Sequence, residues 1–244
     1  MFTFAATPVM YVGLLVLFAW CTLWSAVELI RSTTPQHGVS NALHLVMSVV
    51  MLAMVPRSTY AALSAVVPVG VQAGFFLLAA LWFVALAVRT AGPGRGHFIG
   101  HALMFAAMTW HLVGMMVKMA QMAGHGMGEH AAPGMTGSVD VIAWVGLPFM
   151  AALAWMGCAS LVAWVRPVAG QVPTVRQTTL ASVHAADHHR PPVAAEASCH
   201  DPRPVGSAAE RAHHAMGAAM NLGMFWMSVG LVTPLLPFLA VLHA

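Results

Sequence analysis

The sequence predicts an all-α fold: a polytopic membrane helical bundle of about six transmembrane helices, built from three helical-hairpin pseudo-repeats. Of its 244 residues, 59% are hydrophobic and only 7% are charged, whereas a soluble domain carries roughly 25% charged residues. The chain also contains several apolar stretches close to the roughly 20 residues that a transmembrane helix requires. A motif that occurs three times at corresponding places indicates the repeat of hairpins.

Six apolar segments account for the predicted transmembrane helices. They run over 8–30, 39–55, 68–89, 97–122, 140–165 and 208–232. The second segment is short for a span, so a continuation past Pro56 is an alternative. The third segment has an alternative start near Tyr60, with a bend at Pro68. Pro234 and Pro237 are expected to break or kink the chain after the last helix.

Two segments between the predicted helices have distinctive compositions. Segment 123–139 is rich in Gly, His and Met, and segment 167–207 is long and rich in Pro, Ala and His. The composition of the second segment predicts little regular structure. We expect residues 1–244, with these two loops included, to form a single transmembrane domain.

The distribution of basic residues predicts the orientation in the membrane. If the N-terminus is outside, eight of the ten Lys and Arg residues lie on the inner side, and only Arg57 and Lys118 lie outside. By the positive-inside rule, this bias predicts a multi-pass protein of the cell membrane with both termini extracytoplasmic. The ten basic residues form no patch with interleaved aromatic residues, so we expect lipid and not nucleic acid as the partner of the chain.

The most informative feature is the motif H-x-x-M-x-x-x-M, which begins at His44, His101 and His213. It falls on the second, fourth and sixth predicted helices, which run in the same direction. Its spacing places one histidine and two methionines on one face of each helix, and further residues extend each stripe. The candidate metal ligands are therefore His44, Met47, Met51 and Met54, then His101, Met104, Met108 and His111, and finally His213, Met216, Met220 and Met224.

These residue types favour a soft metal ion. A thioether is uncharged, suits Cu(I) and can be buried in a membrane without the cost of a carboxylate. If the three stripes meet, they predict stacked layers of side chains. The expected layers are Met51 with Met108 and Met220, then Met47 with Met104 and Met216, then His44 with His101 and His213. The alternative is that the methionines only fill space between helices.

Both loops contain further candidate ligands. In the outer loop, His125, Met127 and His130 are candidates for capturing the metal. In the inner loop, Cys199 and His200 are candidates for accepting it, although their spacing matches no closed zinc site. Flexible polar loops that happen to contain histidine are the alternative in both cases.

The motif carries two resemblances to known families. The Met pairs at 47/51, 104/108 and 216/220 resemble the pore motif of Ctr-type copper transporters. That resemblance implies passage of Cu(I) through methionine triads, with Met/His-rich outer segments and a Cys/His acceptor inside. The whole chain, through helices such as HLVMSVVMLAM, is similar to uncharacterised actinobacterial polytopic membrane proteins that are grouped as a domain of unknown function. That similarity implies a membrane location and no assigned activity.

The leading functional hypothesis is a Cu(I)-binding membrane protein that takes up copper. A copper sensor, or a metallochaperone for oxidase assembly, would use the same ligands without a path across the membrane. A haem-binding electron carrier would use the histidines as axial ligands, and a structural subunit would bind no metal. Nucleotide-binding and hydrolase motifs are absent from the sequence, so we do not expect an enzyme. The expected partners are copper and a copper chaperone on either side of the membrane, and the oligomeric state is left open.

Overall fold

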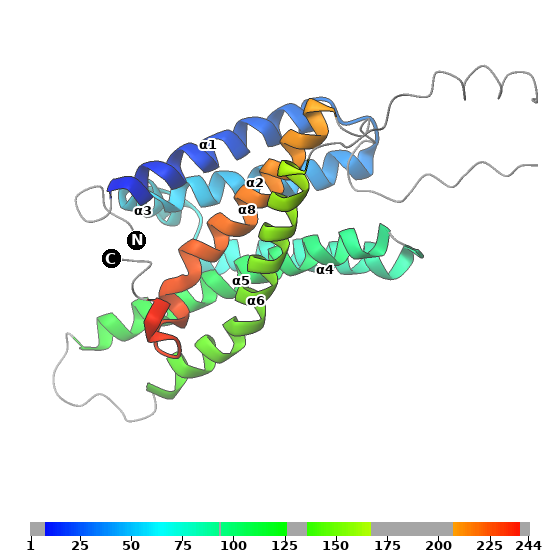
Figure 1. The fold of residues 1–244 in the computed structure, drawn as a ribbon. Helices are drawn as coiled ribbons and strands as arrows, with labels where there is room; N and C mark the ends of the chain where they lie inside the picture. Colours follow the sequence, from blue (N-terminus) through cyan, green and yellow to red (C-terminus); the bar gives the residue numbers. More distant parts are fainter. Residues whose placement is uncertain (1–7, 93, 126–135, 167–206, 240–244) are drawn as a thin grey trace, which may run out of the picture.

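The computed structural model describes residues 8–92, 94–125, 136–166 and 207–239 (Figure 1). Within these ranges the chain forms seven helices and no strand. The helices are α1 (Pro8–Ile30), α2 (Pro35–Met54), α3 (Arg57–Val66), α4 (Val69–Arg89), α5 (Gly94–His125), α6 (Thr136–Val165) and α8 (Ala208–Val232).

Six of these helices, all but the short α3, are long and apolar enough to cross a membrane. The prediction of an all-α bundle with about six transmembrane helices is therefore confirmed. Each span combines sufficient length with few charged residues, in agreement with the low charge content of the whole sequence. The protein is accordingly a multi-pass membrane protein.

The second span reaches its length at its N-terminal end and not past Pro56. Thr34 caps α2 by accepting a hydrogen bond from the backbone N–H of His37 at 3.2 Å, and Pro35 occupies the first turn, where its missing N–H costs nothing. The helix ends at Met54. The expected segment 39–55 therefore begins too late, because a polar cap and a proline extend the helix into less apolar sequence.

Residues before Pro68 form a separate helix, so the alternative of one bent helix from Tyr60 is wrong. Val67 is extended, with φ −120° and ψ 101°, and Pro68 precedes the first turn of α4. A proline disfavours helical conformation in the residue before it, which accounts for the break. The loop between α5 and α6 is also shorter than the expected 123–139, because α5 continues to His125 and α6 begins at Thr136.

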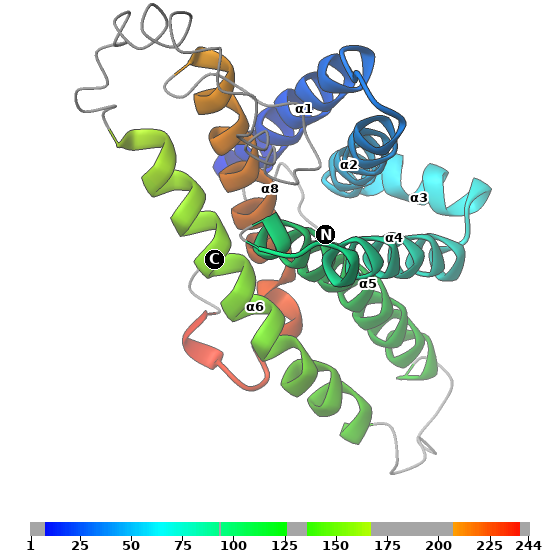
Figure 2. The ribbon, with the colours of Figure 1, turned by 90° about the vertical axis from the view of Figure 1, so that its right-hand side faces the viewer.

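The spans pack as the three expected hairpins. The helix pairs are α1 with α2, α4 with α5, and α6 with α8, and contacts of α5 with α6 and of α1 with α8 join them. The motif helices α2, α5 and α8 run in the same direction through the bundle, as the colour gradient in Figure 1 shows, and Figure 2 shows the same helices turned by 90°. In the first hairpin, the Asn41 amide donates to the Glu28 carbonyl at 3.1 Å and to Ser32 Oγ at 2.8 Å.

Glycines allow the hairpins to approach closely. A Cβ added at Gly146 of α6 would lie 2.0 Å from the ring of Trp110, whose indole N–H donates to the Ile142 carbonyl at 2.9 Å. A Cβ added at Gly223 of α8 would lie 2.6 Å from the ring of Phe18 in α1. The first contact packs α6 of the third hairpin against α5, and the second packs α8 of the same hairpin against α1. Together they fix the position of the third motif.

Candidate functional site

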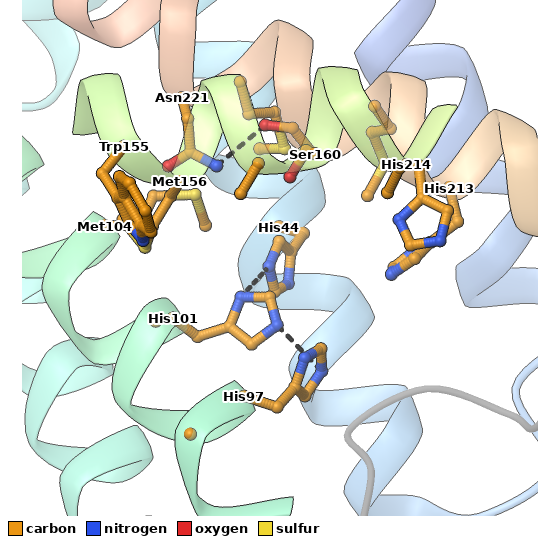
Figure 3. A pocket seen from close by; sticks show the side chains of 17 residues that line it. His44, His97, His101, Met104, Trp155, Met156, Ser160, His213, His214 and Asn221 are labelled. Carbon is orange, nitrogen blue, oxygen red and sulfur yellow. Dashed lines mark hydrogen bonds between the residues drawn. The ribbon is translucent and has the colours of Figure 1, made fainter. Parts of the chain in front are cut away.

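A cavity of about 400 Å³ lies between α5, α6 and α8, and one side chain of α2 reaches its wall (Figure 3). Its wall includes five imidazoles, from His44, His97, His101, His213 and His214. The first histidine of all three H-x-x-M-x-x-x-M motifs therefore borders one space. In Figure 3, His44, His101 and His97 form a row, and His213 and His214 lie on another part of the wall.

The row is a chain of hydrogen bonds. His44 Nδ1 lies 2.7 Å from the Ser40 carbonyl, His44 Nε2 lies 2.9 Å from His101 Nδ1, and His101 Nε2 lies 3.1 Å from His97 Nε2. Because a carbonyl oxygen only accepts, a neutral His44 ring carries its proton on Nδ1. His101 then donates to His44, and His97 donates to His101. One backbone carbonyl thus sets the tautomers of all three rings.

Aromatic rings of α4 and α5 pack against the imidazole pair. Phe83 of α4 and Phe105 of α5 stack at 5.3 Å and are both fully buried. The ring of Phe83 lies 5.1 Å from that of His101, and the ring of Phe105 lies 5.5 Å from that of His44. Both imidazoles therefore contact apolar rings and also border the cavity.

Three of the predicted methionines line the cavity beside the imidazoles. Met104 of α5 and Met216 and Met220 of α8 contribute to the wall, and each is at most 4% exposed. Ser25 of α1 donates a hydrogen bond to the Met216 sulfur at 3.8 Å, which helps to fix the position of that thioether. The cavity therefore combines imidazole nitrogens with soft sulfur atoms from two of the three motifs.

The other predicted ligands on the motif helices do not line the cavity. Met47, Met51, Met54, Met108 and Met224 are buried in the main apolar core. The arrangement of the wall differs from the expected layers, because Met220 lies beside the histidines while α2 contributes only His44.

His111 is bonded elsewhere. Its Nδ1 lies 2.8 Å from Ser228 Oγ, and both residues are buried. The bond ties α5 to α8 away from the cavity wall, so the buried imidazole has a hydrogen-bond partner in the core.

The loop candidates fall outside the described part of the structure. The backbone of α5 includes His125, but the side chain of this residue is outside the described residues. Met127, His130, Cys199 and His200 also lie outside them. The proposed capture and acceptor roles of these residues therefore stay predictions.

The structure adds cavity residues that the motif did not identify. His97 precedes His101 by one helical turn, so extending the stripe toward the N-terminus would have found it. Met156, Trp155 and Ser160 come from α6, which carries no copy of the motif. No sequence signal of the kind used above points to this helix as part of the wall.

Within the described ranges, no group of three or more His, Cys, Asp or Glu side chains is placed to hold a metal ion. The wall of the cavity contains no carboxylate. A metal ion bound here would therefore need thioether ligands beside one or two imidazoles, which is a donor set for a soft ion.

The fold and the site together define the class: a multi-pass membrane protein with a histidine- and methionine-lined cavity among its spans. The family model described as Domain of unknown function (DUF5134) matches residues 36–229, and the chain belongs to this family. The matched region includes all three motifs and every residue of the cavity wall. No curated protein and no solved structure matches the chain significantly.

Proposed function

We propose that this protein binds Cu(I) within the membrane and takes up copper. The observation that carries the proposal is the shared cavity, whose wall contains the histidine of each motif together with Met104, Met216 and Met220. Neutral nitrogen and sulfur donors suit a monovalent soft ion, whereas Ca²⁺ and Mg²⁺ require oxygen ligands that this wall does not supply. The resemblance of the Met pairs to those of Ctr-type transporters supports the same ion.

The proposed direction of copper movement is inward. The positive-inside bias favours extracytoplasmic termini, which would place the cavity near the cytoplasmic ends of α2, α5 and α8. A membrane potential supplies about 2.3 kcal/mol per 100 mV for each elementary charge that enters. Copper would pass along the buried methionines to the histidines and then to a cytoplasmic acceptor, either Cys199 and His200 or a chaperone.

A sensor or metallochaperone is the second candidate. It is favoured by the tight packing of the motif methionines beyond the cavity, where Met47, Met51 and Met108 have no exposed surface. Copper would then have ligands at the cavity, but the packed methionines leave no open path across the membrane. Transport would then require the packed methionines to exchange the ion from sulfur to sulfur.

We expect the purified protein to bind one Cu(I) per chain under reducing conditions. Replacing Met104, Met216 and Met220 together by leucine should remove most of the bound copper, because leucine keeps the apolar volume and removes the sulfur. Elemental analysis after desalting measures the stoichiometry. Met150→Leu is the matched control, because Met150 is also 4% exposed but lies in a separate apolar cluster. Full copper in the triple variant would contradict the proposal, and a Soret band in place of copper would favour haem.

Uptake into sealed vesicles separates the transporter from the sensor. We expect the combined variant Met51→Leu, Met108→Leu and Met220→Leu to reduce copper uptake to the background of empty vesicles. Met51 and Met108 lie in the core and not on the cavity wall, so a double variant of these two should still bind copper at the cavity. Unchanged uptake in the triple variant would exclude passage along the methionines. Copper binding without any uptake in the wild type would favour the sensor.

A further inference from the structure

The cavity is larger than a metal ion requires. Its volume of about 400 Å³ falls in the range of roughly 300–1,000 Å³ that is typical of small-molecule pockets, whereas one water molecule takes about 30 Å³. Much of the space therefore remains after an ion has bound beside the imidazoles. The chemistry of the remaining wall then bears on what else the cavity could hold.

One polar atom on this wall lacks a partner. Asn221 of α8 lines the cavity and is only 8% exposed, and its Oδ1 is buried with no hydrogen-bond partner among the described residues. The amide orientation is fixed by the Gly217 carbonyl, which accepts a hydrogen bond from Nδ2 at 2.8 Å. Turning the amide over would bring two acceptor oxygens together, so Oδ1 must face away from Gly217. A buried acceptor without a donor is destabilising, and a ligand that donates a hydrogen bond would satisfy it.

The surroundings of Asn221 favour an uncharged aromatic ligand. Figure 3 shows Trp155, Met156 and Met104 on the same side of the cavity as Asn221. Indole rings and thioethers make favourable contacts with aromatic rings. The wall has no carboxylate, and the helices that form it are membrane spans, where a charged molecule would lose its hydration.

The cavity wall extends to an exposed side chain of α6. Trp155 belongs to the cavity wall and is 77% exposed, and it lies within the span Asp140–Val165. In a membrane, this exposed face of α6 meets lipid. A hydrophobic molecule dissolved in the bilayer can therefore reach the cavity without passing through water.

We propose that the cavity binds a membrane-soluble aromatic hydroxyl compound of the hydroquinone class. One hydroxyl donates to Asn221 Oδ1, the ring lies against Trp155 and the nearby thioethers, and the second hydroxyl faces the imidazoles across the cavity. The quinone form has carbonyl oxygens in place of both hydroxyls, so it offers no donor to Asn221. The site therefore selects the reduced form over the oxidised form. This binding does not depend on copper.

The test uses durohydroquinone and duroquinone as probes with the full chain in detergent, freed of metal by a chelator and kept anaerobic. Isothermal titration calorimetry should show that the wild type binds durohydroquinone about tenfold or more tightly than duroquinone, the cost of leaving one buried acceptor unpaired. Asn221→Leu should lower the ratio of the two affinities to near one. A merely structural role of Asn221 would weaken both probes equally and leave the ratio unchanged.

Two further variants complete the design. Gln72→Leu is the matched control, because Gln72 is another buried amide with an unpartnered oxygen, is 5% exposed and lies outside the cavity wall. It should keep the preference for durohydroquinone.

Gly96→Leu should abolish binding of both probes, because Gly96 lines the cavity and an added Cβ there meets no atom within 4 Å. Equal affinity of the wild type for the two probes, no binding of either, or a preference that persists in Asn221→Leu would each overturn the inference. None of these results bears on copper binding, which is measured separately.

Discussion

Two histidines of the same stripe have different surroundings. His101 borders the cavity and bonds to His44, whereas His111, further along α5, bonds to Ser228 of α8. The sequence could place both on one face of the helix, because their spacing fits helical periodicity. It could not predict the partners, because a contact between α5 and α8 depends on packing, and serine is too common in membrane helices to signal one.

We expect Ser228→Ala to destabilise the protein by about 1–3 kcal/mol, because it leaves the buried Nδ1 of His111 without a partner. The measurement is unfolding in mixed micelles with a rising fraction of denaturing detergent. Ser48→Ala is the control, because Ser48 is as deeply buried but donates only to the carbonyl of Leu45 in its own helix. A larger loss of stability in the control than in Ser228→Ala would contradict the role assigned to the bond between His111 and Ser228.

The helices themselves could be predicted closely, and their contacts could not. The bounds of α1 and α8 agree with the expected segments 8–30 and 208–232, because a membrane span needs a long run of mainly apolar residues. The division of α3 from α4 required the local effect of Pro68 on Val67. A close contact between α5 and α6 depends on Gly146, and the sequence gives no sign of which aromatic ring will lie against it.

That contact gives a prediction for helix packing. Gly146→Ala should destabilise the protein by about 1–3 kcal/mol or more, because the new methyl would overlap the ring of Trp110, which is itself only 6% exposed. Thermal aggregation in detergent, followed by size-exclusion chromatography, measures the effect. At Gly74 of α4, an added Cβ meets no atom within 4 Å, so Gly74→Ala should be neutral or stabilising through its helix propensity. Equal stability of the two variants would show that α5 and α6 do not approach as described.

At the scale of the whole molecule, the repeat predicted the topology. Three hairpins with the motif on the second helix of each follow from even spacing of the spans, and the parallel direction of α2, α5 and α8 follows from that topology. The repeat did not predict the asymmetry. His44 and His101 bond directly, whereas His213 of the third hairpin lies on another part of the cavity wall. A pattern repeated in sequence specifies equivalent faces but not equal distances between them.

The orientation of the bundle determines on which side of the membrane the cavity lies. His97 lies two residues after Arg95 and soon after Arg89, so the cavity is near the membrane surface that carries these arginines. The positive-inside rule predicts that this surface is cytoplasmic and that Arg57 lies on the opposite side. In a variant with all three native cysteines replaced by serine, Arg57→Cys should react with a membrane-impermeant maleimide in intact cells. Arg89→Cys should react only after permeabilisation, when both positions are labelled equally. The reverse pattern would place the histidines on the outer face, and the cavity would then be suited to capturing copper rather than releasing it.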